Sequence, residues 1–367
     1  MKEEKHTCDI CHEERDLSEL TYFDESYLCE DCLRRETFIC RDCGDRHWND
    51  DSADGDLCQT CYDEDYVRCE RCDAVIHYDD ACYHEDEEYH DHPYCRDCFD
   101  MDEIIHDYYY KPEPIFYGDG PRYLGVELEL DDGGENEFCA SKLLEIANNG
   151  CERMYIKHDG SLDDGFECVT HPMTLDYHIN QMPWKAILNK AVAKGYLSHQ
   201  AGTCGLHVHI SRNALGVNYE EQEATIAKIL YFYEKFWNEI LTFSRRTESQ
   251  VEHWARRYGG GIINPKETLK HAKNSHMGRY AAVNLENEAT IEMRIFRGTL
   301  KYSTFIATLQ MVDEICKVAI SLSDEFMQGL TWLDFVKGIA DGKQELINYL
   351  KEKRLYVNEP IRNEVEI

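Results

Sequence analysis

The sequence predicts an α+β protein with a mainly antiparallel sheet whose helices cover one face, preceded by an N-terminal array of small zinc modules. Three observations lead to this prediction. Several short stretches alternate charged and apolar residues with the period of two that a β-strand requires. Longer stretches between them place apolar residues at helical spacing. Six pairs of cysteines, each with two residues between its members, occur in the first hundred positions.

Length and composition limit the class of protein. The chain has 367 residues, which suits two or three domains, and its 43% hydrophobic content allows a sizeable core. It has no run of about 18 apolar residues, so we expect no membrane partner. The opening residues, MKEEKHTCDIC, lack the apolar stretch of a secretory signal, and we therefore expect a cytoplasmic location. In a reducing compartment, 18 cysteines are more typical of metal ligands than of disulfides.

The formal net charge of −33 is unevenly distributed. Residues 1–112 carry 35 acidic and 11 basic side chains, a net charge of −24, and the remaining residues carry −9. A surface this acidic repels the phosphate backbone of nucleic acids, so we expect no nucleic-acid partner. The charge favours a basic partner or simply keeps the chain soluble, and composition does not choose between these.

The cysteine pairs form a regular array. The gaps between pairs are 17, 14 and 22 residues within a unit and 7 residues between units, so the array repeats about every 30 residues. Two such pairs supply the four soft ligands that tetrahedral Zn²⁺ requires. Sequential pairing gives three four-cysteine sites, and interleaved pairing is the alternative. The predicted zinc ligands are Cys8, Cys11, Cys29, Cys32, Cys40, Cys43, Cys58, Cys61, Cys69, Cys72, Cys95 and Cys98.

Zinc would form the core of these units, because about 30 residues cannot fold on hydrophobic burial alone. A closed all-cysteine site has no open coordination position, so we expect no catalysis there. The units resemble LIM-like or treble-clef zinc modules. We interpret residues 1–100 as three tandem zinc modules that recognise a protein. Residues 101–122 contain three prolines and are expected to form an extended linker.

Residues 123–367 are expected to form the sheet domain. GVELEL places Glu127 and Glu129 on one strand face, and GLHVHI places His207 and His209 on one strand face. In both stretches the other face is apolar. Charged groups are costly to bury unless an opposite charge lies beside them. We therefore expect these strands to share a sheet whose polar face binds metal and phosphate.

A third stretch, ATIEMRIFRGTL at residues 289–300, repeats the pattern. As one continuous strand it places Glu292, Arg294 and Phe296 on one face, with isoleucine and methionine on the other. The further strands are predicted over 123–130, 154–158, 165–170, 202–211 and 279–285. The helices are predicted over 137–148, from Pro183 to about 194, and over 219–243, 302–321, 332–340 and 344–354.

Five motifs in order carry a resemblance to a known family. GVELEL, HDGSLDDGFECVTHP, TCGLHVHI, RYAAVNL and TIEMRIFRGTLK, within about residues 115–320, resemble the amidoligase family. That family belongs to the carboxylate–amine ligases of the glutamine synthetase and glutamate–cysteine ligase fold. The resemblance implies a glutamine synthetase-like sheet and an ATP-dependent amidoligase. Such an enzyme phosphorylates a carboxylate to an acyl phosphate, which an amine attacks. The zinc array would then recognise a protein or peptide substrate.

The resemblance also implies roles for single residues. Magnesium (or manganese) would be held by Glu127, Glu129, Glu167, His207 and Glu292. Contacts with nucleotide phosphate or substrate would come from His209, Arg279 and Asn284. Arg294 would stabilise the phosphoryl group in transfer with Arg297 nearby, and Asp159 would orient or deprotonate the amine. The hard Mg²⁺ ion suits such a site, since ATP could not approach so many carboxylates without it.

Two other functions stay open. The same fold could carry a phosphotransferase of the guanidino-kinase type, or the sheet could be inactive and the zinc array a protein-binding adaptor. Each strand motif alone is also typical of a solvated strand face. Arg245, Arg246, Arg256 and Arg257 fit either a substrate clamp or a solvated basic stretch. The chain has no GxxxxGKS or GxxxxGKT loop, which excludes a P-loop enzyme.

Overall fold

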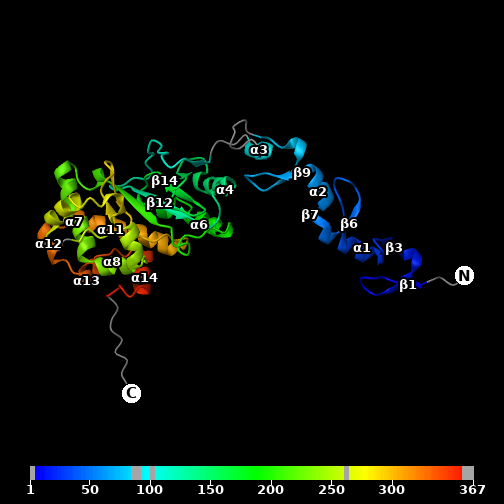
Figure 1. Ribbon diagram of the computed structural model, residues 1–367. Helices are drawn as coiled ribbons and strands as arrows, with labels where there is room; N and C mark the ends of the chain where they lie inside the picture. Colours follow the sequence, from blue (N-terminus) through cyan, green and yellow to red (C-terminus); the bar gives the residue numbers. More distant parts are fainter. Residues whose placement is uncertain (1–4, 84–91, 100–103, 260–263, 358–367) are drawn as a thin grey trace, which may run out of the picture. The chain divides into compact units, whose positions relative to one another are not determined.

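The computed structural model describes residues 5–83, 92–99, 104–259 and 264–357. Internal contacts divide the chain into two compact units, Met1–Asp102 and Glu103–Ile367 (Figure 1). The first three residues of the predicted linker, 101–103, lie outside the described residues. Within the described ranges, no helix is long and apolar enough to cross a membrane.

The first unit contains three modules, and the first two have the same order of elements. Module 1 contains β1 (Lys5–Thr7), β2 (Glu14–Asp16), η1 (Leu17–Glu19), β3 (Leu20–Phe23), β4 (Ser26–Cys29) and α1 (Glu30–Glu36). Module 2 contains β5 (Thr37–Ile39), β6 (Arg46–Trp48), η2 (Asn49–Asp51), β7 (Ser52–Asp54), β8 (Leu57–Cys58) and α2 (Gln59–Asp65). Module 3 contains β9 (Tyr66–Arg68), β10 (Val75–His77), η3 (Tyr78–Asp80) and α3 (Arg96–Phe99). In each module the first cysteine pair lies in the turn of the opening hairpin and the second at the start of the helix.

The core of each of the first two modules is very small. Its buried residues are cysteines and one leucine, and partly buried side chains of the same module and of the next one pack against them. Trp48 packs on module 1, where its ring lies 5.2 Å from that of Phe23 and its Nε1 donates to Asp24 at 2.6 Å. Tyr66 and Val75 of module 3 pack on the core of module 2. The modules follow one another without a linker, since β5 starts directly after α1 and β9 directly after α2.

The second unit is built on a seven-stranded sheet. Its strands are β11 (Ile105–His106), β12 (Leu124–Leu130), β13 (Met154–Lys157), β14 (Phe166–Thr170), β15 (Leu206–Ser211), β16 (Val283–Asn284) and β17 (Thr290–Met293). They lie in the order β11-β13-β14-β12-β15-β17-β16. β11 pairs with β13 in parallel, and the other neighbouring pairs are antiparallel. The predicted α+β class is confirmed, while the glutamine synthetase-like arrangement stays a prediction.

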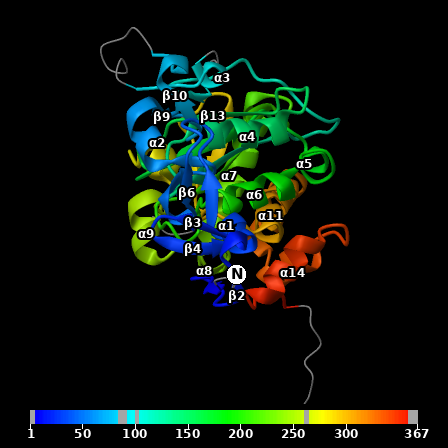
Figure 2. The ribbon, with the colours of Figure 1, turned by 90° about the vertical axis from the view of Figure 1, so that its right-hand side faces the viewer.

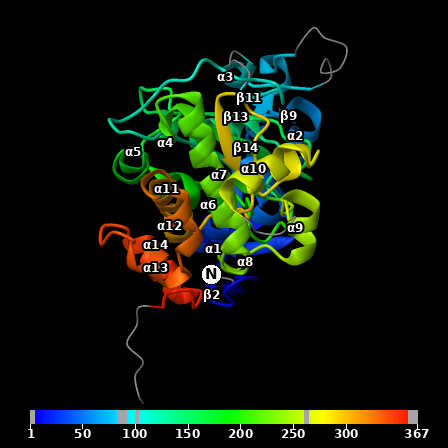
Figure 3. The same ribbon diagram turned by 90° about the vertical axis from the view of Figure 1, so that its left-hand side faces the viewer.

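Helices connect and cover these strands. The described helices are α4 (Glu137–Asn148), α5 (Leu175–Asn180), α6 (Trp184–Ala193), η4 (Arg212–Ala214), α7 (Tyr219–Lys235), α8 (Trp237–Ser244), α9 (Glu248–Trp254), α10 (Pro265–Lys273), η5 (Gly278–Tyr280), α11 (Tyr302–Ser321), α12 (Asp324–Gly329), α13 (Trp332–Lys337) and α14 (Gln344–Glu352). Figures 2 and 3 both show α4, α5, α6 and α11 side by side, and Figure 3 shows α12, α13 and α14 gathered near α11.

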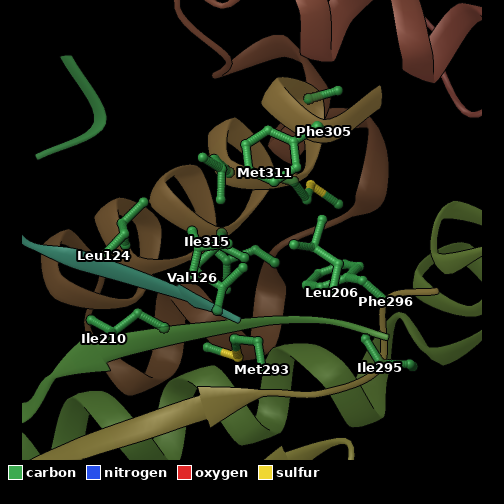
Figure 4. Packing of buried hydrophobic residues seen from close by; sticks show 14 of the residues in the cluster. Leu124, Val126, Leu206, Ile210, Met293, Ile295, Phe296, Phe305, Met311 and Ile315 are labelled. Atoms are coloured by element: carbon green, nitrogen blue, oxygen red, sulfur yellow. The ribbon is translucent and has the colours of Figure 1, made fainter. Parts of the chain in front are cut away.

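The apolar face of the sheet packs against α11. Figure 4 shows one cluster of buried side chains from β12, β15, β17, the segment after β17, and α11: Leu124, Val126, Leu206, Ile210, Met293, Ile295, Phe296, Phe305, Met311 and Ile315. Side chains alternate along a strand, so the residues between these apolar positions point to the opposite face. That opposite face carries the predicted acids and histidines.

The predicted helix over 219–243 is wrong, because it is two helices. Phe236 has φ −106° and ψ 34°, outside the helical region, so α7 ends at Lys235 and α8 starts at Trp237. The apolar pattern continues across the break, since both helices bury residues in the same core. Periodicity therefore could not reveal the break.

Two predicted strands are also shorter than expected. β17 ends at Met293, and Ile295 and Phe296 are both fully buried, so the alternation of faces stops there. The predicted strand over 279–285 is instead the 3₁₀-helix η5 followed by the two-residue β16. Part of the predicted linker is regular, since β11 forms an edge strand of the sheet.

His178 is a neutral histidine inside the core. Its Nε2 lies 3.0 Å from the carbonyl oxygen of Leu124, and its Nδ1 accepts from the indole Nε1 of Trp184 at 3.2 Å. A carbonyl only accepts and an indole only donates, so these partners fix the neutral tautomer. Burial lowers the pKa of His178 to about 4, although the bond to Leu124 opposes the shift.

Stability is therefore expected to fall with acid. In the unfolded chain His178 takes up a proton near its ordinary pKa of about 6.5, whereas in the folded protein it does so only near 4. Its contribution to the free energy of unfolding is therefore complete above about pH 6.5 and is lost progressively as the pH falls toward 4. From pH 7 to pH 5 the loss is about 2 kcal/mol. Urea unfolding of the full chain followed by tryptophan fluorescence measures it. His178→Gln should remove that part of the pH dependence, while the exposed control His253→Gln should keep it.

Candidate metal and phosphate site

The polar face of the sheet brings the predicted acids and histidines into one row. Across the strands, Glu167 of β14 lies opposite Glu129 of β12, and Glu127 of β12 lies opposite His207 of β15. Glu292 of β17 lies opposite both His209 of β15 and Asn284 of β16. The row borders a cavity of about 230 Å³, which we call the polar cavity.

His207 lies between two groups of carboxylates. Its Nδ1 is 3.3 Å from Glu127 and 3.6 Å from Glu292, and its Nε2 is 3.6 Å from Glu129. Two sets of possible ligand atoms result, Glu127 with His207 and Glu292, and Glu129 with Glu167 and His207. Within each set the atoms lie within 4.8 Å of one another. A neutral imidazole has one lone pair for a metal, so His207 can serve as a ligand in only one set at a time.

The carboxylates have shifted proton affinities. Burial and the charge of Glu127 raise the pKa of Glu167 well above its usual range, and burial raises the pKa of Glu129. Burial alone would also raise the pKa of Glu127, but His209 and His207 hold it well below its usual range. His209 Nε2 lies 3.0 Å from Glu127. The row thus contains more acid than its two histidines neutralise, which is the condition a divalent cation relieves.

Cationic side chains lie beside the acids. Arg294 Nη1 is 2.5 Å from Glu292, and Lys157 Nζ is 3.2 Å from Glu167. Arg246 is buried, and its Nε donates to the carbonyl oxygen of Ile295 at 3.1 Å. Burial lowers the pKa of Arg246 to about 10, with Glu129 opposing the shift. Arg294 Nε and Arg246 Nη1 are buried without a hydrogen-bond partner.

Gly205 makes room for this arrangement. A Cβ at this position would lie 2.4 Å from Nε2 of His207 and 3.0 Å from Nη2 of Arg246. The backbone N–H of Gly205 also donates to Glu129. Because real Cβ atoms do not approach so closely, a side chain here would displace the imidazole or the guanidinium.

The rim of the polar cavity contains further predicted residues. Asp159 Oδ1 accepts from the backbone N–H of Ser161 at 2.7 Å and from its hydroxyl at 2.5 Å. Asn284 Nδ2 donates to Glu292 at 2.8 Å. Arg279 donates to the hydroxyls of Tyr108 and Tyr280, the second at 3.1 Å. All of these side chains line the polar cavity.

Arg297 is not brought to the polar cavity. Only the family resemblance implied a place near phosphate, because an unbroken alternation of faces would put Arg297 on the apolar side with Ile295. Arg297 instead forms an isolated bridge with Gly205, and its side chain is not among the described residues that line this cavity. The other predicted metal, phosphate and amine residues all line it: Glu127, Glu129, Asp159, Glu167, His207, His209, Arg279, Asn284, Glu292 and Arg294.

Sequence reasoning missed Lys157 and left Arg246 undecided. Lys157 had a usable signal, because MYIK alternates Met154 and Ile156 with Tyr155 and Lys157. Arg246 had no such signal, because it follows a helix and lies on no strand. Its neighbour Arg245 lines a different cavity, so the pair of arginines does not act as one group.

An apolar cavity of about 410 Å³ adjoins the polar one. Both cavities include Tyr108, Glu127, Lys157, His209 and Asn287 in their lining. The remainder of the apolar cavity is rich in aromatic residues and prolines: Tyr109, Tyr110, Pro112, Pro114, Phe116, Tyr123, Tyr155 and Pro172. Its surface suits a planar ring or an apolar group.

In the first unit, the four cysteines of each module come together. The groups are Cys8, Cys11, Cys29 and Cys32; Cys40, Cys43, Cys58 and Cys61; and Cys69, Cys72, Cys95 and Cys98. Burial opposes ionisation of the first thiol of each group, but backbone N–H donors outweigh it and lower the pKa values of Cys8 and Cys40 to about 6. Burial and the neighbouring sulfurs raise the pKa of Cys32 to about 12. Ionisation of all four thiols in one group therefore requires a bound cation, as in a zinc site.

The second unit thus has a donor set for divalent cations beside donors for an anion. The sequence model of the family described as "Putative amidoligase enzyme" matches residues 146–316. This range includes β14, β15, β16 and β17, and therefore Glu167, His207 and Glu292. It begins after β12, which carries Glu127 and Glu129. The matched region is amidoligase-like, as the resemblance of its motifs implied.

Comparison with whole proteins adds little. No curated protein matches the sequence. Among solved structures, the chain is similar to a bifunctional glutathione synthetase from Pasteurella multocida, with 13% identity and a TM-score of 0.32. The similarity covers 65% of this chain and 45% of that protein, less than half of its length. A TM-score this low carries no argument about fold or function.

Proposed function

We propose that the second unit is an ATP-dependent carboxylate–amine ligase that forms an amide bond through an acyl phosphate. The observation that carries the proposal is the polar cavity, where two sets of metal-ligand atoms lie beside guanidinium groups with unpartnered donors. The match of residues 146–316 to an amidoligase family supports the reaction class.

The donor set fits divalent magnesium or manganese. Four glutamates supply the hard oxygen ligands that these ions prefer, and His207 supplies one nitrogen. Glu127 and Glu292 would hold one ion and Glu129 and Glu167 the other. When bound, the ions would neutralise the triphosphate of ATP and orient its terminal phosphate. Burial and the charge of Glu127 raise the pKa of Glu167 although Lys157 lies beside it, and a divalent cation would stabilise its charged form.

Side chains of the protein would then assist the transfer of the terminal phosphoryl group of ATP. Arg294 and Arg246 would donate to the phosphoryl oxygens as charge develops on them, through the donors that lack partners in the protein. His209 and Arg279 would contact the remaining phosphates, and the aromatic apolar cavity would accept the base. The carboxylate oxygen takes the terminal phosphoryl group and ADP leaves.

The second half of the reaction would form the amide. Asp159, held by Ser161, would orient the amine and accept its proton. The amine nitrogen attacks the acyl carbon, the carbon–oxygen bond to phosphate breaks, and inorganic phosphate leaves. The zinc modules would position a protein or peptide substrate, and their acidic surface favours a basic one.

Product analysis of the full-length protein tests the proposal. The protein is incubated with ATP, Mg²⁺ and panels of carboxylates and amines that include basic peptides and polyamines. We expect ADP and phosphate to be released only when a carboxylate and an amine are both present, with one amide formed per ADP.

Other outcomes would support the alternatives. A stable phosphorylated product without condensation would assign a phosphotransferase instead. If calorimetry detects no binding of ATP with Mg²⁺, the sheet is inactive and the zinc array carries the function.

A further inference from the structure

A second charged cavity lies apart from the polar one. Its volume is about 580 Å³, and it is formed by the segment before β15, the residue after α8, the start of α11 and the end of α14. His199, Arg245, Lys301 and Lys353 are part of its lining, and we call it the basic cavity. Among the described residues, none lines both the basic and the polar cavity.

Positive charge exceeds negative charge in the basic cavity. Glu352 is the one carboxylate among its described lining residues. It lies 3.2 Å from Nζ of Lys301 and 3.7 Å from Nζ of Lys353, so one acid serves two ammonium groups. Arg245 uses its side chain for backbone carbonyl oxygens, one of them that of Arg297. An excess of cations is unexpected in a chain with a net charge of −33.

Arg297 adds another cation beside this cavity. Burial, together with the charges of Arg297, Arg245 and Lys353, lowers the pKa of His199. His199 Nδ1 and Arg297 Nε are both buried without a hydrogen-bond partner. Buried polar atoms nearly always have a partner in folded proteins, so two unpartnered nitrogens in one cationic cluster suggest a missing acceptor.

The start of α11 adds a partial positive charge at the same place. This helix has 20 residues, and its N-cap residue Lys301 makes no side-chain cap, because an ammonium group cannot accept a hydrogen bond. The first-turn N–H groups of a helix attract anions when they are not capped. Thr304 of this first turn lines the basic cavity.

We propose that the basic cavity binds a small oxyanion, a phosphate or a carboxylate group, at a site distinct from the polar cavity. The planar guanidinium of Arg245 suits such a group, and Lys301 and Lys353 supply further charge. Arg245 is adjacent to Arg246, which lines the polar cavity.

Calorimetric titration with inorganic phosphate tests this site in the full-length protein, without added divalent metal. Loss of one charged contact is expected to weaken binding about tenfold. We therefore expect Arg245→Gln and Lys353→Gln each to bind phosphate about tenfold more weakly than the wild type. Lys185→Gln removes the same charge from an exposed position on α6 and should bind as the wild type does.

A parallel titration with succinate separates the two sources of the oxyanion. Variant-sensitive binding of phosphate, of succinate or of both supports the site and identifies the group it prefers. Absence of binding by both anions, or equal affinity in the wild type and Lys353→Gln, overturns it. If Arg245→Gln does not fold, Lys353→Gln alone decides, because its side chain lies at the end of α14 and is partly exposed. None of these results depends on ligase activity.

Discussion

Replacing Glu292 by alanine is expected to lower ATP-dependent amide formation by about a thousandfold. Glu292 contacts His207, Asn284 and Arg294, so its loss affects three neighbours at once. One set of metal ligands would keep only Glu127 and His207. Arg294 would lose the carboxylate that holds its guanidinium. Turnover measured with saturating ATP and Mg²⁺, with Mn²⁺ affinity by calorimetry, checks both effects.

Glu288→Ala is the matched control for this experiment. Glu288 is exposed, four residues earlier on the same segment, and outside the polar cavity, so its replacement should leave turnover and metal affinity unchanged. Full turnover in Glu292→Ala would contradict the assignment of the polar cavity as the catalytic site. Lost turnover with unchanged metal affinity would instead show that Glu292 acts by orienting the guanidinium of Arg294.

Replacing Cys40 by serine is expected to unfold module 2. The core of this module is three buried cysteines and a leucine, and a structural zinc ion stabilises modules of this kind by about 10–16 kcal/mol. Without the ion, burial of so little apolar surface cannot offset the entropy of the chain. Zinc content should fall from three equivalents to two or fewer, and limited proteolysis should cut within residues 37–65.

The exposed Cys151 provides the control, because it belongs to the second unit and to none of the cysteine clusters. Cys151→Ser should retain three equivalents of zinc and resist cleavage within residues 37–65. Retention of all three equivalents by Cys40→Ser would show that the cluster around Cys40 does not hold zinc.

The fold could be predicted where one signal decides the structure. Alternation in GVELEL and GLHVHI sets which side chains share a face, and both strands form with that register. Hydrophobic periodicity gave wrong element boundaries where tertiary packing overrides the local pattern. Ile295 and Phe296 are consecutive and both buried, which no single strand face allows, and Phe236 interrupts a helix whose apolar stripe continues.

The candidate site was predictable to the extent that its residues lie on regular strands. Glu127, Glu167 and Glu292 are far apart in the chain, yet each occupies the polar face of a strand in one sheet. Arg297 and Arg246 lie outside regular strands, so the alternation of faces gave no information on them. Arg246 enters the polar cavity because its Nε binds the carbonyl oxygen of Ile295, a contact between distant segments that the sequence does not display.

The packing of Trp48, Tyr66 and Val75 couples the stabilities of neighbouring modules in the first unit. Trp48 of module 2 packs on the core of module 1, and Tyr66 and Val75 of module 3 pack on the core of module 2. In a linear array, stability is the sum of each repeat and its nearest-neighbour contacts. Each contact between modules stabilises both of its partners, so loosening of one module should also weaken the module next to it.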